Sequence, residues 1–189
     1  MQWPDQLPWP QRPVWGLNWF EARAYARWLN LQMQARLSQI GLGSQGYTVQ
    51  LPTELQWERA ARASSKTAVD ARTWPWGDDQ TVADQQSNVN SSVGRATTVG
   101  LYPASPLGLL DMAGNVWDWM DNAYETGPTA ARLAKDAKVI ETADRLPPAL
   151  RGGSWADHPV NARCSYRGMF FPGGCDYFVG VRVVLSLAK

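Results

Sequence analysis

Two segments with the apolar spacing of a helix lie in the first third of the chain, and turn residues interrupt the rest at short intervals. Residues 18–39 carry apolar side chains at three- and four-residue steps, with Asn18 placed to cap the helix. Thr53 opens a second such segment, and Gln56 stands three residues later as its capping-box partner. A short strand is expected at 47–51. Two early helices followed by scattered short strands predict the α+β class.

The remaining segments favour loops and short strands. Between residues 63 and 106 we expect loops ordered by tryptophan packing more than by regular strand pairing. Residues 112–119 read as a compact turn followed by a strand, and residues 124–146 as a surface excursion with some helix. Residues 179–185 have the composition of a central strand. The length of the chain suits a single domain over residues 1–189.

Composition excludes several classes of function. A formal net charge of +1 argues against a nucleic-acid partner, which needs a concentrated basic surface. The longest apolar runs are too short to span a bilayer, so membrane insertion is not expected. The first residues show no secretory signal, which leaves a cytoplasmic or phage-associated location as the default expectation.

Several phrases follow one another in a specific order along nearly the whole chain. They are Leu-Pro-Thr-Glu-Leu-Gln-Trp-Glu-Arg-Ala-Ala-Arg at 51–62, Pro-Leu-Gly-Leu-Leu-Asp-Met-Ala-Gly-Asn-Val-Trp-Asp-Trp at 106–119, Leu-Arg-Gly-Gly-Ser-Trp at 150–155 and Val-Gly-Val-Arg-Val at 179–183. Together they resemble the formylglycine-generating-enzyme (sulfatase-modifying-factor) family. The resemblance implies a C-type lectin fold of the formylglycine-generating-enzyme subclass, with two helices, short antiparallel strands and long ordered loops.

The chain departs from the oxidases of that family at the reactive thiols. By the resemblance, those enzymes act through two cysteines that follow the Gly-Gly-Ser-aromatic phrase, where this chain has Asp157 and, a few residues on, Ala162. Cys164 and Cys175 lie further along. We therefore expect a protein that is not an enzyme and requires no cofactor. The alternative is a formylglycine-generating-type oxidase or sulfoxide synthase.

Residues 150–184 resemble something narrower, the variable region of diversity-generating retroelement target proteins. In those systems a reverse transcriptase randomises template adenines, so that AAC codons become codons ending in C, which cannot encode Lys, Glu, Gln or Trp. The positions between the framework residues are then the expected ligand-binding positions. They are Ala156, Asp157, His158, Val160, Cys164, Ser165, Gly168, Met169, Phe170, Phe171, Gly173, Gly174, Cys175, Asp176, Tyr177 and Phe178.

None of these sixteen positions holds one of the four disallowed types, although those types make up 32 of the 189 residues. Chance alone gives this result about one time in twenty. Met169 is the one residue that an AAC-derived codon cannot give, so it is either a fixed position or the product of another template codon. The presence of the only histidine, His158, and of both cysteines among these positions then needs no catalytic or metal-binding purpose.

The cluster of Met169, Phe170 and Phe171 with Tyr177 and Phe178 is too apolar for an ordinary surface loop. Exposed aromatic patches of this kind mark interaction sites, so we expect a protein or surface ligand as partner. The alternative is that these side chains pack inward. The framework arginines are expected to donate hydrogen bonds to backbone carbonyls, since regular ladders are few. They are Arg151, Arg163, Arg167 and Arg182.

The resemblance also implies a structural calcium site, from side chains and backbone carbonyls in the phrase at 111–118. Its ligands here would be Asp111, Gly114, Val116 and Asp118, and hard cations prefer such oxygens. Asp118 is shorter than the glutamate usual at that place. The alternative is that backbone N–H groups satisfy both carboxylates.

Overall fold

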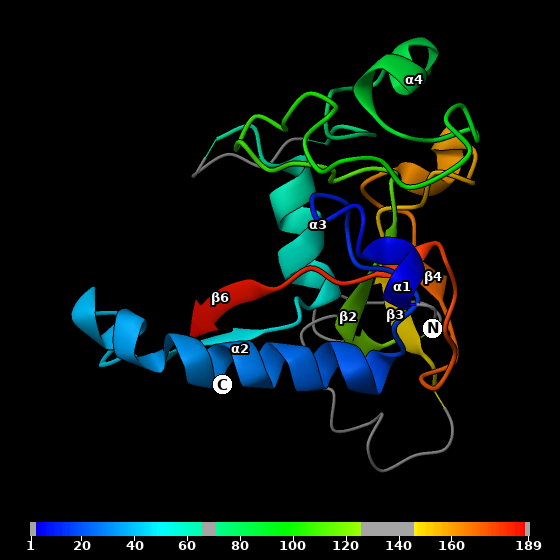
Figure 1. Ribbon diagram of the computed structural model, residues 1–189. Coiled ribbons are helices and arrows are strands. Elements are labelled where there is room, and N and C mark those ends of the chain that lie inside the picture. The colour runs from blue at the N-terminus through cyan, green and yellow to red at the C-terminus, as the bar shows by residue number, and fades with distance from the viewer. Residues whose placement is uncertain (1–2, 66–70, 126–145, 188–189) are drawn as a thin grey trace.

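A computed structural model describes residues 3–65, 71–125 and 146–187 (Figure 1). Short helices and strands are joined by long ordered loops. In chain order the elements are α1 (Trp3–Gln6), α2 (Trp19–Gln39), β1 (Tyr47–Gln50), α3 (Glu54–Arg62), the 3-10 helix η1 (Gln80–Val82), α4 (Ala83–Gln86), β2 (Trp117–Ala123), β3 (Pro148–Arg151), the 3-10 helix η2 (Pro159–Ala162), β4 (Gly168–Met169), β5 (Val179–Gly180) and β6 (Val184–Leu187).

Both expected helices are present, and each begins with the capping box that the sequence indicates. Asn18 Oδ1 accepts from the Glu21 backbone N–H (2.9 Å), and Glu21 Oε2 accepts in return from the Asn18 N–H (2.8 Å). Thr53 and Gln56 make the same reciprocal pair at the start of α3. The structure confirms the α+β class and adds two four-residue helices, α1 and α4.

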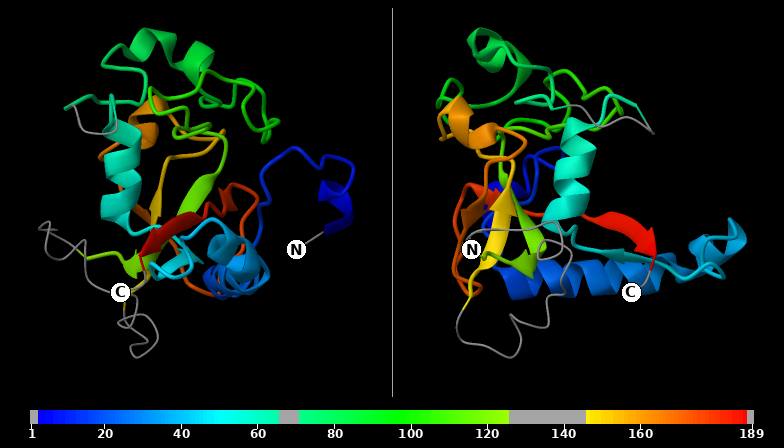
Figure 2. Two further views of the ribbon diagram at one scale, coloured as in Figure 1. Left: turned by 90° about the vertical axis from the view of Figure 1, so that its left-hand side faces the viewer. Right: turned by 180° about the vertical axis from the view of Figure 1, so that it is seen from behind.

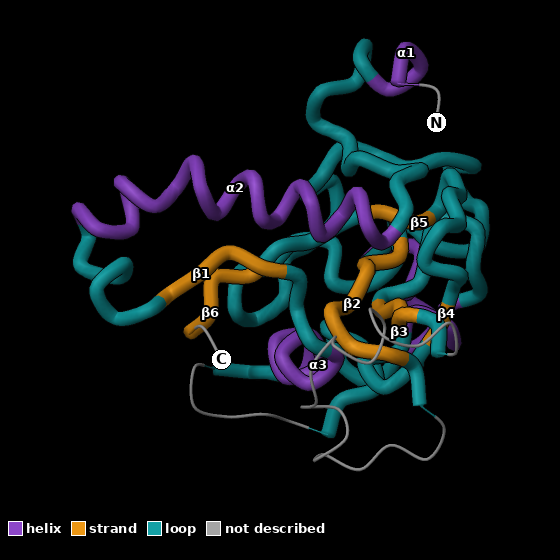
Figure 3. Tube along the Cα trace, turned by 90° about the horizontal axis from the view of Figure 1, so that it is seen from below, coloured by secondary structure: helices purple, strands orange, loops and turns teal. Residues whose placement is uncertain are grey.

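The strands form two separate sheets. One has four strands in the order β4-β3-β2-β5, in which β2 pairs antiparallel with β3 and parallel with β5. The other is a two-stranded antiparallel ribbon of β1 and β6. The ribbon lies along α2, whose N-terminal end adjoins β5 (Figure 3). The loops that carry α4 gather at the opposite end of the molecule (Figure 2).

Tryptophans form much of the core between α2 and the four-stranded sheet. Trp19 and Trp119 are both fully buried. Trp19 Nε1 donates to the Met120 carbonyl (2.9 Å) and Trp119 Nε1 to the Leu17 carbonyl (3.0 Å), which ties the start of α2 to β2. In the loop region the Trp74 indole donates to the Pro159 carbonyl (2.8 Å). This agrees with the expectation that tryptophan packing orders the loops.

The expectation of one central strand over 179–185 is wrong, because two different sheets divide this segment. Residues 179–180 form β5, at the edge of the four-stranded sheet, and residues 184–187 form β6 in the ribbon. Between them Arg182 turns its guanidinium onto Asp118 (Nε to Oδ2, 2.9 Å). Gly180 lies so close to Val14 that a Cβ there would come within 2.6 Å of the Val14 carbonyl oxygen.

The surface excursion expected at 124–146 lies almost entirely outside the described residues. In the part of the chain that is described, no helix combines the length and the apolar character that crossing a bilayer requires.

Candidate ligand-binding surface

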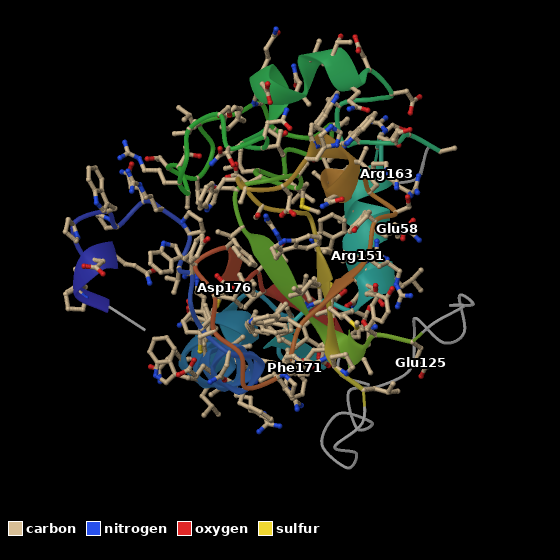
Figure 4. All side chains as sticks on the ribbon, turned by 90° about the vertical axis from the view of Figure 1, so that its right-hand side faces the viewer. Glu58, Glu125, Arg151, Arg163, Phe171 and Asp176 are labelled. Atoms are coloured by element: carbon tan, nitrogen blue, oxygen red, sulfur yellow. The ribbon has the colours of Figure 1, made fainter. Side chains whose placement is uncertain are left out.

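The start of the segment 150–184 is anchored to α3 by a buried arginine. Arg151 is fully buried at the end of β3, and its Nε donates to Glu54 Oε1 (2.9 Å). Its Nη2 donates to Glu58 Oε2 (2.9 Å) and its Nη1 to the Cys164 carbonyl (2.8 Å). Figure 4 shows Arg151 and Glu58 side by side, where α3 meets the segment 150–184. All the donor atoms of this guanidinium therefore bond to groups within the fold.

Glu54 is the acceptor that joins this anchor to a second arginine. Arg167 donates to both of its carboxylate oxygens (2.7 Å each), and Asn122 Nδ2 donates to Oε2 (2.9 Å). Burial raises the pKa of Glu54, but the hydrogen bond from Arg167 and the charge of Arg151 outweigh it. The pKa of the carboxyl therefore lies below its ordinary value, and Glu54 is held as an anion.

The four framework arginines bond to backbone carbonyls as the sequence predicts. Arg163 Nε donates to the Val160 carbonyl (2.9 Å), Arg167 Nη1 to that of Glu125 (2.7 Å) and Arg182 Nη2 to those of Leu110 and Asp111 (3.0 Å each). The sequence reasoning missed the carboxylates that share them. Glu54 lies in the first turn of α3, where acidic residues are common for dipole reasons alone, and Glu58 lies one turn later, so neither carries a local signal for this role.

Side chains alternate in exposure along residues 168–178, at the far end of the segment. The odd-numbered residues are exposed, and the even-numbered ones are half-buried. Only residues 168–169 form a strand, and turns occupy 172–173 and 177–178, so strand and turns together set which residues face outward. We call the exposed set the outer row; it consists of Met169, Phe171, Gly173, Cys175 and Tyr177.

Some side chains of the apolar cluster face outward and others pack inward, so each of the two alternatives holds for part of the cluster. Phe171 is 76% exposed, and Met169 and Tyr177 are each more than half exposed. Phe170 and Phe178 instead pack against the main core. The exposed rings keep contacts with the framework, since the Tyr177 ring lies 5.7 Å from that of Trp155. The outer row thus presents apolar side chains on an ordered base.

Besides Phe170 and Phe178, two more of the expected ligand-binding positions are used within the fold. Cys164 is fully buried, and burial raises the pKa of its thiol to about 12. Asp157 Oδ2 accepts from the Ser154 hydroxyl (2.5 Å) and from Trp117 Nε1 (2.9 Å), so its carboxylate is used within the fold. These two side chains stabilise the base of the segment, which the codon argument had no means of detecting.

The other expected positions lie at or near the surface. Ala156, His158 and Ser165 are exposed. The remaining positions are half-buried, and they are Val160, Gly168, Gly174 and Asp176. His158 uses its ring to accept from the Val160 backbone N–H (3.3 Å), which starts η2.

Comparison with known proteins agrees with the order of the phrases. A family profile described as "Sulfatase-modifying factor enzyme 1-like domain" matches residues 5–187. The chain belongs to this family. It is 31% identical over 177 residues to the hercynine oxygenase of Mycobacterium tuberculosis, covering 93% of this chain and 37% of that protein. It is 29% identical to the serine/threonine-protein kinase pkn1 of Chlamydia pneumoniae, covering 94% of this chain and 24% of that protein.

Among solved structures, Treponema denticola variable protein 1 superposes with a TM-score of 0.72 at 23% identity, over 92% of this chain and 70% of that one. At this identity the likeness shows the fold, which is the C-type lectin fold of the sulfatase-modifying-factor family. The chain spans about a third or less of the length of the two curated relatives above.

The two thiols do not face a common space in this family member. Cys164 is buried and Cys175 is exposed, and both are free. Among the described residues, no group of three or more His, Cys, Asp or Glu side chains is placed to hold a metal ion.

The four expected calcium ligands do come together. Asp111, Gly114, Val116 and Asp118 line one cavity of about 160 Å³. Burial raises the pKa of Asp111, and the nearby charge of Asp118 adds to the effect. The oxygen types fit a hard cation, but the Arg182 guanidinium already bonds to Asp118 Oδ2 and to the Asp111 carbonyl.

The alternative was that backbone N–H groups satisfy the carboxylates of both Asp111 and Asp118, and it holds for Asp111 only. The Gly100 N–H donates to Asp111 Oδ2 (2.9 Å), whereas Asp118 receives side-chain donors, Arg182 and the Trp57 indole.

Proposed function

We propose that this chain is a binding protein without catalytic activity, formed by one C-type lectin type domain over residues 1–189. Its segment 150–184 is diversified by a retroelement, and the diversification changes the target that it recognises. The observation that carries the proposal is the outer row, a set of residues exposed at every second position on a segment with a buried, ion-paired base. Such a segment can change its contacts without changing its fold.

The exposed outer row and the buried base should differ in how well they tolerate substitution, which supports the proposal. Exposed side chains away from caps and buried groups are usually replaced at a cost within about 0.5 kcal/mol. The base is different, because Arg151 and Glu54 are both fully buried and paired. A diversified segment needs this arrangement, since each new variant must still fold. The name of the structural neighbour from Treponema denticola, a variable protein, agrees with the proposal.

The chemistry of the outer row supports a protein or other apolar surface as the target. Phe171 and Tyr177 offer large contact areas with few rotatable bonds, and aromatic side chains of this kind dominate binding energy at interfaces. The formal net charge of +1 gives no support to a nucleic-acid target. We propose no role in membrane insertion.

The alternative is an oxidase or sulfoxide synthase, to which the similarity to hercynine oxygenase points. Against it stand the positions of the two thiols. The pKa of the Cys164 thiol, at about 12, keeps that group protonated, and a protonated thiol is a poor metal ligand and nucleophile. Oxygen consumption with a thiol substrate and added copper or iron would favour the enzyme.

The genomic neighbourhood tests the leading proposal. We expect a reverse-transcriptase gene nearby, and a near-copy of the DNA that encodes residues 150–184, differing from it only at adenines. The differing codons should fall at the sixteen expected positions, the outer row above all. If the flanking DNA holds neither the gene nor the near-copy, diversification is ruled out.

We further propose that the cavity lined by Asp111 and Asp118 binds a structural calcium ion. Ca²⁺ should raise the Tm of the wild-type chain, relative to chelator, by more than it raises the Tm of Asp111→Asn. Asparagine keeps an acceptor for the Gly100 N–H and tolerates the positive φ of 50° at this residue. Equal shifts in both proteins would contradict calcium binding here.

A further inference from the structure

The first turn of α2 is joined directly to the variable segment. The Trp19 backbone N–H donates to the Pro172 carbonyl (3.0 Å), next to Phe171 in the outer row. The Gly16 N–H, just before the helix, donates to the Val179 carbonyl (2.9 Å). In Figure 4 the labelled Phe171 lies beside the start of α2. The position of this turn relative to the outer row is therefore set by backbone hydrogen bonds.

Phe20 lies on this turn and faces solvent. Its side chain is 53% exposed, and its ring meets that of buried Trp19 edge to face, with centroids 5.3 Å apart. Neither helix capping nor core packing uses the exposed part of the ring. Phe20 thus follows Trp19, whose backbone bonds to Pro172, and Phe171 precedes Pro172, so two exposed phenylalanines flank one backbone hydrogen bond between α2 and the segment 150–184.

We infer that Phe20 is a fixed contact of the recognition surface, shared by every target that the outer row binds. The inference rests on the function proposed above. Because Phe20 lies outside residues 150–184, diversification leaves it unchanged. It supplies apolar contact to any protein target, and the outer row supplies the choice among targets.

The partner is a protein with an apolar patch large enough to cover both Phe20 and the outer row. Continuity with the outer row argues for this occupant, since one partner seated on Phe171 reaches the adjoining turn of α2. Aromatic side chains at the centre of an interface contribute most when neighbouring contacts exclude water from them. Phe20 and Phe171 together give such a patch more area than either ring alone.

Trp28 provides a matched control on the same helix. It is also 53% exposed, and its ring contacts Tyr25 at 5.8 Å. It lies about two turns, or ~12 Å along the axis, beyond Phe20 and away from the variable segment. If any exposed aromatic ring on α2 served equally well, Trp28 and Phe20 would behave alike.

The experiment uses the full chain and a phage-displayed library of random twelve-residue peptides as the probe. Peptides are selected on the wild-type chain after removal of those that bind Phe171→Ala, which leaves peptides that require the outer row. Dissociation constants of individual peptides are then measured for the wild type, Phe20→Ala and Trp28→Ala. Thermal melts establish that each variant is folded, and Phe20→Leu serves as a second variant that keeps an apolar side chain.

We expect Phe20→Ala to weaken peptides of different sequence by tenfold or more, which equals about 1.4 kcal/mol. Phe20→Leu should be intermediate, and Trp28→Ala should change binding less than twofold. Phe20→Ala and Trp28→Ala affecting all peptides equally would overturn the inference while leaving the proposed function standing. Recovery of no peptide that depends on Phe171 would overturn the proposed function, and this inference with it. A chain that dimerises through Phe20, by analytical ultracentrifugation, would replace the protein target with a second copy.

Discussion

Replacing Arg151 with methionine tests whether the buried ion network holds the variable segment in place. Methionine has a similar length and no charge, so Arg151→Met leaves the carboxylate of Glu58 and the Cys164 carbonyl without their buried donor. Removing one partner of a buried ion pair costs about 3–5 kcal/mol. Here Arg167 still donates twice to Glu54, which compensates part of the remaining charge. We therefore expect the low end, about 3 kcal/mol.

The assay is chemical and thermal unfolding followed by circular dichroism. For a chain of this size each kcal/mol lowers the Tm by about 2–4 °C, so Arg151→Met should lower it by about 6–12 °C. Arg59→Met is the control, because Arg59 lies on α3 with its side chain exposed. A loss below about 1 kcal/mol in Arg151→Met, or an equal loss in Arg59→Met, would refute the role given to the network.

Three further predictions concern the same segment and its base. The pKa of Glu54 is lowered in the folded state. Its contribution to stability is therefore present above the unfolded-state pKa of about 4.3 and is lost as the pH falls through the lower folded value. The Tm, measured from pH 7 to pH 3, should fall less steeply in Glu54→Gln than in the wild type. Iodoacetamide should modify Cys175 and spare the buried Cys164 in the folded protein, and mass spectrometry showing two adducts under native conditions would contradict that burial. Phe171→Ser should change the free energy of unfolding by less than about 0.5 kcal/mol, because the ring is exposed. Phe170→Ser should lower it by about 2 kcal/mol, because that ring packs against the core. Equal losses of the two variants in urea titrations would contradict an outward-facing row.

Features that depend on neighbours in sequence were predictable. Asn18 with Glu21 and Thr53 with Gln56 are pairs three residues apart, and a hydrogen bond over that span needs only one turn of helix. The ordered phrases along the chain identified the family in the same way. They also placed the four expected calcium ligands, which the fold gathers around one cavity.

Features that depend on partners distant in sequence were not predictable. Residues 179–185 have one strand-like composition, yet they are divided between β5 and β6, and between these strands Arg182 bonds to Asp118, 64 residues away in sequence. Nothing in the local pattern indicates that break. Codons ending in C can encode both Cys164 and Phe171, and only packing separates the buried thiol from the ring that is 76% exposed.

The sequence by itself determined the family, the two capped helices and the framework arginines, because each rests on local spacing or on residue identity. The tertiary structure alone decided which variable positions face outward and which carboxylates hold the arginines. It also decided that the start of α2 bonds to Pro172, next to Phe171 in the outer row. Arg151 and Glu54 are 97 residues apart, and their pairing follows from packing α3 against β3 rather than from any pattern along the chain. Burial and long-range pairing depend on that packing, so a surface for recognition becomes visible only once the chain is folded.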